Sequence, residues 1–232
     1  MARVLVIGDT HCPVMHKGYV PFLQKIADSW AVDKVVHIGD MVDWASISYH
    51  PKAPSLKNSE AEYEKAAKQV EKIYAAFPEA TWLIGNHDAL TERQLFDAGL
   101  PFSVLKDYKE MWAVPNWEII PRYGQKVIDS VIYMHGDKGR GGRFPAIANA
   151  ESEFQSVVQG HAHSAAGVMY GANNNLRYFG LQTGCGVDYT SAAMSYGHKY
   201  PRKPILGCGI VIDGTTAVFE PMHLGNKYGV LK

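Results

Sequence analysis

The 232-residue sequence has little cysteine, no net charge and no long apolar run. Its three cysteines (Cys12, Cys185 and Cys208) are an odd number without a CxxC spacing, so neither a disulfide scaffold nor a zinc knuckle is expected. Lys and Arg together number 23, as do Asp and Glu, so no overall field draws the chain to nucleic acid or to a membrane surface. Any contact with nucleic acid would have to be local.

The apolar run at the N-terminus, Val4 to Gly8, is too short for the apolar core of a signal peptide. No other stretch approaches the roughly 20 residues of a membrane span. We therefore predict a cytoplasmic protein without a membrane segment. At about 150 residues per domain, and without a repeat or linker, the chain is predicted to form one domain over residues 1–232.

The first third of the chain alternates between strand and helix patterns. Short β-branched runs predict buried strands at 3–8, 34–39 and 80–85. Apolar residues at helical spacing predict helices at 19–31 and 59–77, the second opened by a capping box of Ser59 and Glu62. Strand–helix–strand units of this length indicate a parallel sheet with right-handed crossovers.

The second half is richer in strands, which we expect to be mostly antiparallel. They are predicted at 117–123, 126–136, 156–160, 167–171, 176–182, 206–213 and 216–221. A short helix is predicted at 144–153, and hairpin turns at 171–175 and 213–214. The whole pattern predicts an α/β fold: a four-layer α/β/β/α sandwich of two mixed β-sheets with helices on the outer faces.

Polar side chains follow a glycine at five predicted strand ends. The five blocks read GDTH (8–11), GDMVD (39–43), GNHD (85–88), HGD (135–137) and GHAH (160–163). In open α/β sheets the ligand crevice lies beyond the carboxyl ends of the strands, so these blocks are expected to meet in one place. The glycines allow sharp turns and close approach of the backbone.

The blocks offer carboxylate, amide and imidazole groups without a thiolate. Such a set suits manganese, iron, zinc or magnesium. Seven candidates exceed the needs of one ion, so two ions about 3.5–4 Å apart, bridged by a carboxylate, are expected to clamp a phosphate and activate a water. Taken singly, each residue fits ordinary turn or capping chemistry as well. The seven candidate ligands are Asp9, His11, Asp40, Asn86, His135, His161 and His163.

In this order, DxH, GDxxD, GNHD, HG and GHxH, the blocks resemble the calcineurin-like metallophosphoesterase superfamily. The resemblance implies two divalent metal ions, with manganese preferred and iron, zinc, nickel or magnesium as alternatives. It also implies a bridging role for Asp40. The first ion would be held by Asp9, His11, Asp40 and His163, and the second by Asp40, Asn86, His135 and His161.

The resemblance also assigns roles to residues that do not bind metal. His87 would lie over the phosphate and protonate or stabilise the leaving oxygen, and Asp43 would orient its imidazole. This agrees with the chemistry of the residues, because histidine can give a proton near neutral pH and a carboxylate partner fixes its tautomer. Asp88 is a further candidate for supporting the site.

Departures from subfamily patterns bear on the substrate. Protein Ser/Thr phosphatases of this superfamily read GDxVDRG and GNHE, whereas here Trp44 follows Asp43 and Asp88 replaces the glutamate. The closing GHxH block instead resembles the phosphodiesterase and nuclease branches. We therefore predict a phosphodiesterase acting on a phosphate ester of nucleotide or nucleic-acid type. The alternatives are a phosphomonoesterase, including a protein phosphatase, and a non-catalytic metal-binding scaffold.

Two segments are candidates for substrate selection. Arg140 and Arg143, among glycines directly after the HGD block, are predicted to bind substrate phosphate, with a solvated loop as the alternative. Residues 189–203 interleave tyrosines with cations, as a nucleotide groove does, although the segment fits an irregular surface loop better. His37 and Cys12 are expected simply to pack in the core. The oligomeric state stays open.

Overall fold

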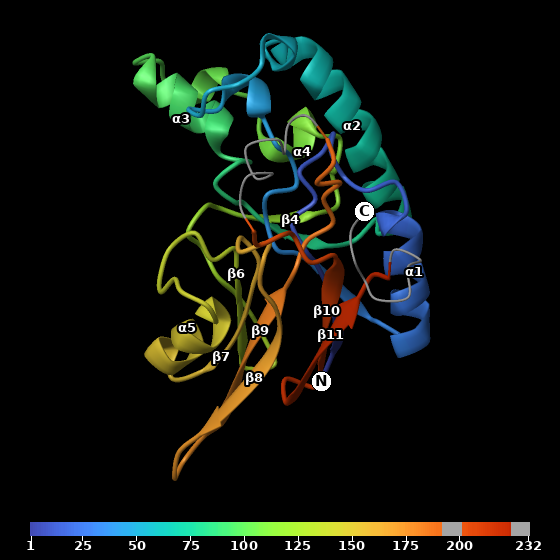
Figure 1. Cartoon of the computed structure of the whole chain (residues 1–232), viewed down its shortest axis with the longest axis vertical. Helices are drawn as coiled ribbons and strands as arrows, with labels where there is room; N and C mark the ends of the chain where they lie inside the picture. The colour runs from blue at the N-terminus through green and yellow to red at the C-terminus, as the bar shows by residue number, and fades with distance from the viewer. Residues whose placement is uncertain (192–200, 224–232) are drawn as a thin grey trace.

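Two β-sheets form the centre of the computed structural model, which describes residues 1–191 and 201–223 (Figure 1). The six-stranded sheet has the order β11 (Thr216–Pro221), β10 (Gly207–Ile212), β1 (Arg3–Ile7), β2 (Lys34–His37), β3 (Thr81–Leu83), β4 (Glu118–Ile120). The five-stranded sheet has the order β5 (Lys126–Ile128), β6 (Val131–Met134), β7 (Ser156–Gln159), β9 (Arg177–Thr183), β8 (Ala166–Ala172).

Both sheets are mixed, as predicted. In the first, β1 to β4 are parallel, and the pairings β1–β10 and β10–β11 are antiparallel. The pairings β5–β6, β8–β9, β1–β10 and β10–β11 are antiparallel, so the expectation of a mostly antiparallel second half is confirmed, although β6, β7 and β9 are parallel to one another. The physical reason is that α5 (Pro145–Glu153) carries the chain from the end of β6 back to the start of β7, and such a crossover makes two strands parallel.

Alternating side chains of β1 divide the core into separate layers. Leu5 and Ile7 pack with residues of α1 (Tyr19–Trp30) and α2 (Ser59–Ala76). Val4 and Val6 pack on the opposite face, against the second sheet. Because successive side chains of a strand point to opposite faces, one short apolar strand serves both layers.

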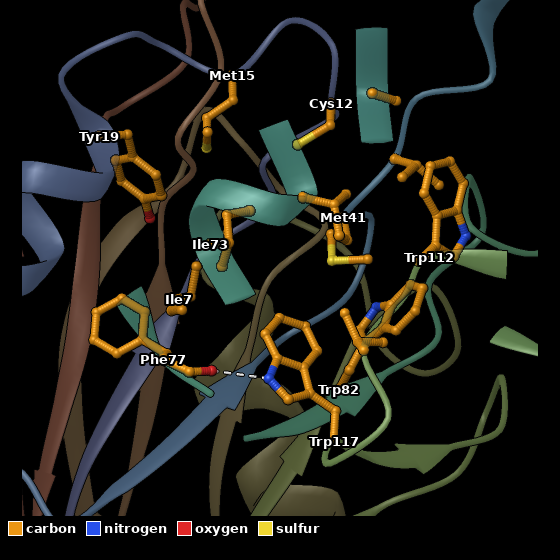
Figure 2. Packing of buried hydrophobic residues seen from close by; sticks show 14 of the residues in the cluster. Ile7, Cys12, Met15, Tyr19, Met41, Ile73, Phe77, Trp82, Trp112 and Trp117 are labelled. Carbon is orange, nitrogen blue, oxygen red and sulfur yellow. Dashed lines mark hydrogen bonds between the residues drawn. The ribbon is translucent and has the colours of Figure 1, made fainter. Parts of the chain in front are cut away.

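The helix-covered layer is rich in aromatic residues (Figure 2). Trp82, Trp112 and Trp117 are almost fully buried in it, and the indole N–H of Trp117 donates to the backbone oxygen of Phe77 at 2.9 Å. This bond joins the chain before β4 to the end of α2.

The second sheet is covered by α5 on its outer face. Tyr133 of β6 faces the first sheet, whereas Ile132 and Met134 pack with Ala150 of α5. The layers are therefore helix, sheet, sheet, helix, and the predicted four-layer α/β/β/α fold class is confirmed. No helix in the described ranges is long and apolar enough to cross a membrane.

The start of α2 differs from the predicted capping box. The side chain of Asn58 accepts the backbone N–H of Ala61 at 3.0 Å, so Ser59 is the first helical residue rather than the cap. The Glu62 carboxylate instead accepts the backbone N–H groups of residues 45–46. It ties the loop after β2 to the helix.

The strand predicted at 126–136 is a hairpin. Asp129 and Ser130 both have positive φ, 48° and 63°, and form the two-residue turn between β5 and β6. The hairpin turns predicted at 171–175 and 213–214 are confirmed as the connections β8–β9 and β10–β11. The remaining helical elements were not predicted: α3 (Leu90–Asp97), α4 (Tyr108–Met111), η1 (Ala45–Ile47), η2 (Pro54–Leu56) and η3 (Phe102–Val104).

Candidate metal centre

The structure brings the seven predicted metal ligands together at the carboxyl ends of β1, β2, β3, β6 and β7. One group consists of Asp9, His11 and His163. His163 Nε2 lies 3.0 Å from Asp9 Oδ2 and 3.1 Å from His11 Nε2. These three side chains come from the two ends of a 155-residue span, so only the folded sheets place them side by side.

A second group forms around His135. Its Nε2 lies 3.1 Å from Asn86 Oδ1 and 3.3 Å from Asp40 Oδ2. The ring of His161 completes the group, with its centroid 5.2 Å from that of His135. Asp40 belongs to both halves of the site, because the same Oδ2 is 3.6 Å from His11 Nε2.

Two of the histidine rings are held in orientation by hydrogen bonds at Nδ1. His11 Nδ1 donates to Asp43 Oδ1 at 2.8 Å, and His135 Nδ1 donates to the backbone oxygen of Ile38 at 3.1 Å. These bonds keep the proton on Nδ1 and direct the Nε2 lone pair of each ring into the centre. In their neutral form, these two rings therefore present Nε2 to the centre as a possible metal ligand.

Such a set fits divalent cations. Metal–ligand bonds of about 2.1 Å place two ligand atoms of one ion roughly 3.0–3.4 Å apart. The separations of 3.0–3.3 Å around His163 and His135 match this spacing. Lone pairs this close repel one another unless a cation or a proton lies between them.

The electrostatics of the centre favour positive charge. Burial alone would raise the pKa of Asp40, but the surrounding histidines, His135 foremost, hold it well below its usual range. Burial would lower the pKa of His135, but Asp40 reverses this and raises it to about 10. Burial lowers the pKa of His11, so this ring stays neutral and available as a ligand.

Glycine is required beside two of the carboxylates. A Cβ atom at Gly85 would lie 2.3 Å from Asp40 Oδ1, and one at Gly160 would lie 2.2 Å from Asp9 Oδ1. Any side chain at these positions would displace a carboxylate. The glycines of the blocks therefore serve close approach as much as turning.

His87 lies at the edge of the centre, with its side chain 19% exposed. Its Nδ1 donates to the backbone oxygen of Asp43 at 2.7 Å, and its backbone N–H donates to Asp40 Oδ1 at 2.7 Å. His87 also groups with His11 and Asp40 in an arrangement that could hold a metal, but because its Nδ1 donates to a carbonyl, only Nε2 has a lone pair to offer. Nε2 is left as the reactive atom of the ring.

Asp43 has a second role that the sequence did not indicate. Its Oδ1 lies 3.3 Å from His87 Nδ1 as well as 2.8 Å from His11 Nδ1. Burial would raise the pKa of Asp43, but the hydrogen bonds with these two histidines lower it to about 2. One ionised carboxylate thus positions a candidate ligand and the candidate acid.

Asp88 joins the loops beneath the site. Its carboxylate accepts the backbone N–H of Val42 at 3.0 Å, that of Gly85 at 2.8 Å and the indole N–H of Trp82 at 3.1 Å. Burial, followed by the charge of Asp40, raises the pKa of Asp88 to about 7. The side chain holds the loop that carries Asp43 against the loop that carries Asn86 and His87.

Two further side chains lie close to the site without facing the ligand atoms. His37 is fully buried and its Nε2 lies 3.1 Å from Thr10 Oγ1, and burial lowers its pKa to about 3. Cys12 is also fully buried, and burial raises its pKa to about 12. Both side chains pack behind the loops rather than at the cluster of ligand atoms.

The two arginines predicted to bind phosphate differ in surroundings. Arg140 Nε donates to Ser152 Oγ of α5 at 2.9 Å, which turns its guanidinium towards that helix. Arg143 lies over the ring of Phe144, 5.2 Å from the centroid, and lines a pocket beside the metal centre. From the tyrosine-rich segment, Tyr196, His198, Lys199 and Tyr200 lie outside the described residues.

The fold and the site together define an α/β protein with a candidate metal-binding centre at its strand ends. A family model described as "Calcineurin-like phosphoesterase" matches residues 2–198, nearly the whole chain. The chain therefore belongs to the calcineurin-like phosphoesterase family. No curated protein matches it significantly.

Several solved structures resemble this one at low sequence identity. Vacuolar protein sorting 29 from Cryptosporidium parvum has 15% identity and a TM-score of 0.46, with 95% of this chain and 97% of that chain covered. The phosphoesterase YfcE from E. coli has 11% identity and a TM-score of 0.38, with 90% and 88% covered. The nuclease MPE from Pseudomonas putida has 12% identity and a TM-score of 0.33, with 93% and 86% covered.

Proposed function

We propose that this protein hydrolyses phosphodiester bonds with the help of two divalent cations. The observation that carries the proposal is the position of Asp40, whose Oδ2 lies 3.3 Å from His135 Nε2 and 3.6 Å from His11 Nε2. A carboxylate shared between two sets of lone-pair donors is typical of a site for two metals. Manganese is the ion we propose first, and the donor set of oxygen and imidazole nitrogen without thiolate suits iron, zinc and magnesium as well.

The two ion sites would share Asp40. One site would consist of Asp9, His11, Asp40 and His163, and the other of Asp40, Asn86, His135 and His161. A pair of divalent cations neutralises the charge of a phosphate group and supplies a nucleophile from water near neutral pH. The chain contributes fixed geometry, because Asp43 and the backbone oxygen of Ile38 prevent the ligating rings from turning.

His87 would act on the leaving oxygen. The Nδ1 bond to the backbone oxygen of Asp43 leaves Nε2 as the ring atom that can carry the transferable proton. The bond from its backbone N–H to Asp40 Oδ1 fixes the distance between the ring and the centre. Donation from Nε2 would release the departing alcohol without a free alkoxide.

A diester is favoured over a phosphoprotein as substrate by the residues around Asp43. The position where protein phosphatases have an arginine holds Trp44, which is 8% exposed and packs against Tyr63 and Trp112. No guanidinium is therefore supplied at this point to bind the dianionic monoester. Arg143, beside the centre, is the candidate for binding a single non-esterified oxygen.

Rates on two chromogenic substrates test the proposal. With Mn²⁺, bis(4-nitrophenyl) phosphate should be hydrolysed with a higher kcat/KM than 4-nitrophenyl phosphate, and Asn86→Ala should abolish both activities. The opposite preference would make the protein a phosphomonoesterase. Bound metal without turnover of either ester would support a non-catalytic scaffold.

We further propose a cytoplasmic location. Cys12, Cys185 and Cys208 are buried free thiols, as expected in a reducing compartment. Cell fractionation with an antibody would test the location, and recovery in an extracellular fraction would contradict it.

A further inference from the structure

A pocket of about 430 Å³ lies beside the candidate metal centre. It is lined by residues at the start of α5, in β8 and β9, and in the loop that precedes β8. Pockets for small organic ligands commonly measure about 300–1,000 Å³. The volume therefore suits one ring system with a sugar attached.

The pocket wall and the metal centre share a loop. Ala162, which lines the pocket, stands between His161 and His163. Ile205, which also lines the pocket, donates its backbone N–H to the backbone oxygen of His163 at 2.8 Å. A group bound in the pocket would therefore lie next to the loop that carries both proposed histidine ligands.

The lining combines flat apolar surface with cations. Phe144, half exposed, and Val168 and Met169 of β8 supply apolar contact. Arg143 and Arg202 also line the pocket. An aromatic face beside guanidinium groups is the combination on which proteins stack nucleobases while holding the attached phosphates.

One buried acceptor in the wall lacks a partner. Gln182 of β9 lines the pocket and is only 4% exposed. Its amide N–H donates to the backbone oxygen of Gly160, which fixes the orientation of the amide. Within the described part of the chain, its Oε1 finds no hydrogen-bond donor. A buried acceptor without a donor is costly, so a ligand that brings an N–H would relieve it.

We propose that this pocket holds a nucleobase of the phosphodiester substrate, with a base N–H donated to Gln182 Oε1. The inference rests on the proposed function, which supplies the adjoining phosphate. Every common base carries an amino or imino N–H on a flat aromatic ring, whereas a lipid tail carries neither. The substrate class is therefore a nucleotide-containing diester.

Binding of uncharged probes to the metal-free full-length chain tests the proposal separately from catalysis. Nucleosides are preferable to nucleotides here, because without metals the carboxylates would repel a phosphate. Adenosine, guanosine, cytidine and uridine are titrated in EDTA and followed by NMR, with methyl riboside and benzyl alcohol as probes that lack the base or its N–H. At least one nucleoside should bind about tenfold more tightly than either control.

Three variants connect the binding to the pocket. Gln182→Met should weaken nucleoside binding by about fivefold. Ala165→Trp, at a partly exposed position of the pocket wall, should fill the space and remove the preference for nucleosides. Arg177→Ala, an exposed arginine of β9 outside the lining, is the matched control and should bind as the wild type does. Thermal denaturation shows that each variant folds.

The outcomes separate this inference from the proposed function. Equal binding of benzyl alcohol and the best nucleoside, or no nucleoside binding at all, overturns the nucleobase pocket whether or not the protein hydrolyses diesters. Unchanged nucleoside binding in both Gln182→Met and Ala165→Trp overturns it as well. Nucleoside binding without any diesterase activity supports the pocket and contradicts the proposed function.

Discussion

Replacement of Gly160 by alanine tests whether close backbone approach holds the metal centre together. The added Cβ would lie 2.2 Å from Asp9 Oδ1 and 2.5 Å from Ile38 Cγ2. Local relaxation is restricted, because the Gly160 N–H donates to the backbone oxygen of His135 and its own oxygen accepts from Gln182. The Asp9 carboxylate and the Ile38 side chain are therefore the groups that must move.

The expected loss of stability follows from the steric overlap of the added Cβ with its neighbours. Overpacking of this kind costs about 1–3 kcal/mol of folding stability. In a chain of this size, about 2–4 °C of Tm correspond to each kcal/mol, so Tm should fall by roughly 2–12 °C. Displacement of Asp9 should also weaken metal binding about 10–100-fold, the usual effect of disturbing the shell around a metal site.

The assay combines thermal denaturation with titration of Mn²⁺. Gly141→Ala is the matched control, because a Cβ at Gly141 meets nothing within 4 Å and the residue has no positive φ. If Gly160→Ala and Gly141→Ala have the same Tm and the same metal affinity, steric confinement of Asp9 is not what shapes the site.

Three further substitutions separate the roles around the centre. Asp43→Ala removes the acceptor of His11 Nδ1 and should weaken Mn²⁺ binding about 10–100-fold in a titration; unaltered affinity would show that His11 is oriented otherwise. His87→Ala should lower kcat about 10²- to 10⁴-fold while metal analysis still finds both ions, and loss of an ion would make His87 a ligand. Arg143→Ala should raise KM for a diester more than Arg140→Ala, whose guanidinium is engaged by Ser152; equal KM values would exclude a phosphate role for Arg143.

The layered fold could be predicted because its information is local. In β1 the run from Val4 to Ile7 is apolar on both faces, which is typical of a strand buried between two layers. The convergence of the polar blocks could be predicted too, since the ends of parallel strands meet at one edge. Both inferences needed only the order of elements along the chain.

Other features could not be predicted because two neighbouring residues suit the same role almost equally well. Asn58 and Ser59 are both good helix caps, and the structure selects Asn58 through its bond to Ala61. The turn at Asp129 and Ser130 lacks the glycine that marks most two-residue hairpins, so 126–136 resembled one strand. Such details are settled by tertiary contacts.

Side-chain directions in loops were beyond sequence reasoning. Arg140 and Arg143 are three residues apart among glycines, yet only Arg143 lines the pocket beside the centre. The double contact of Asp43 with His11 and His87 requires three loops to meet, and no spacing in the sequence encodes it. The unpartnered amide oxygen of Gln182 is likewise visible only in the folded chain.

The metal content of the purified protein tests the central claim most directly. After loading with Mn²⁺ and removal of excess ion, the wild type should contain about two manganese ions per chain, as measured by elemental mass spectrometry. Asp40→Ala should lose both ions together because its carboxylate is shared, whereas Asp28→Ala, at an exposed position of α1, should retain them. A wild type without bound ions, or Asp40→Ala with both ions retained, would contradict the account.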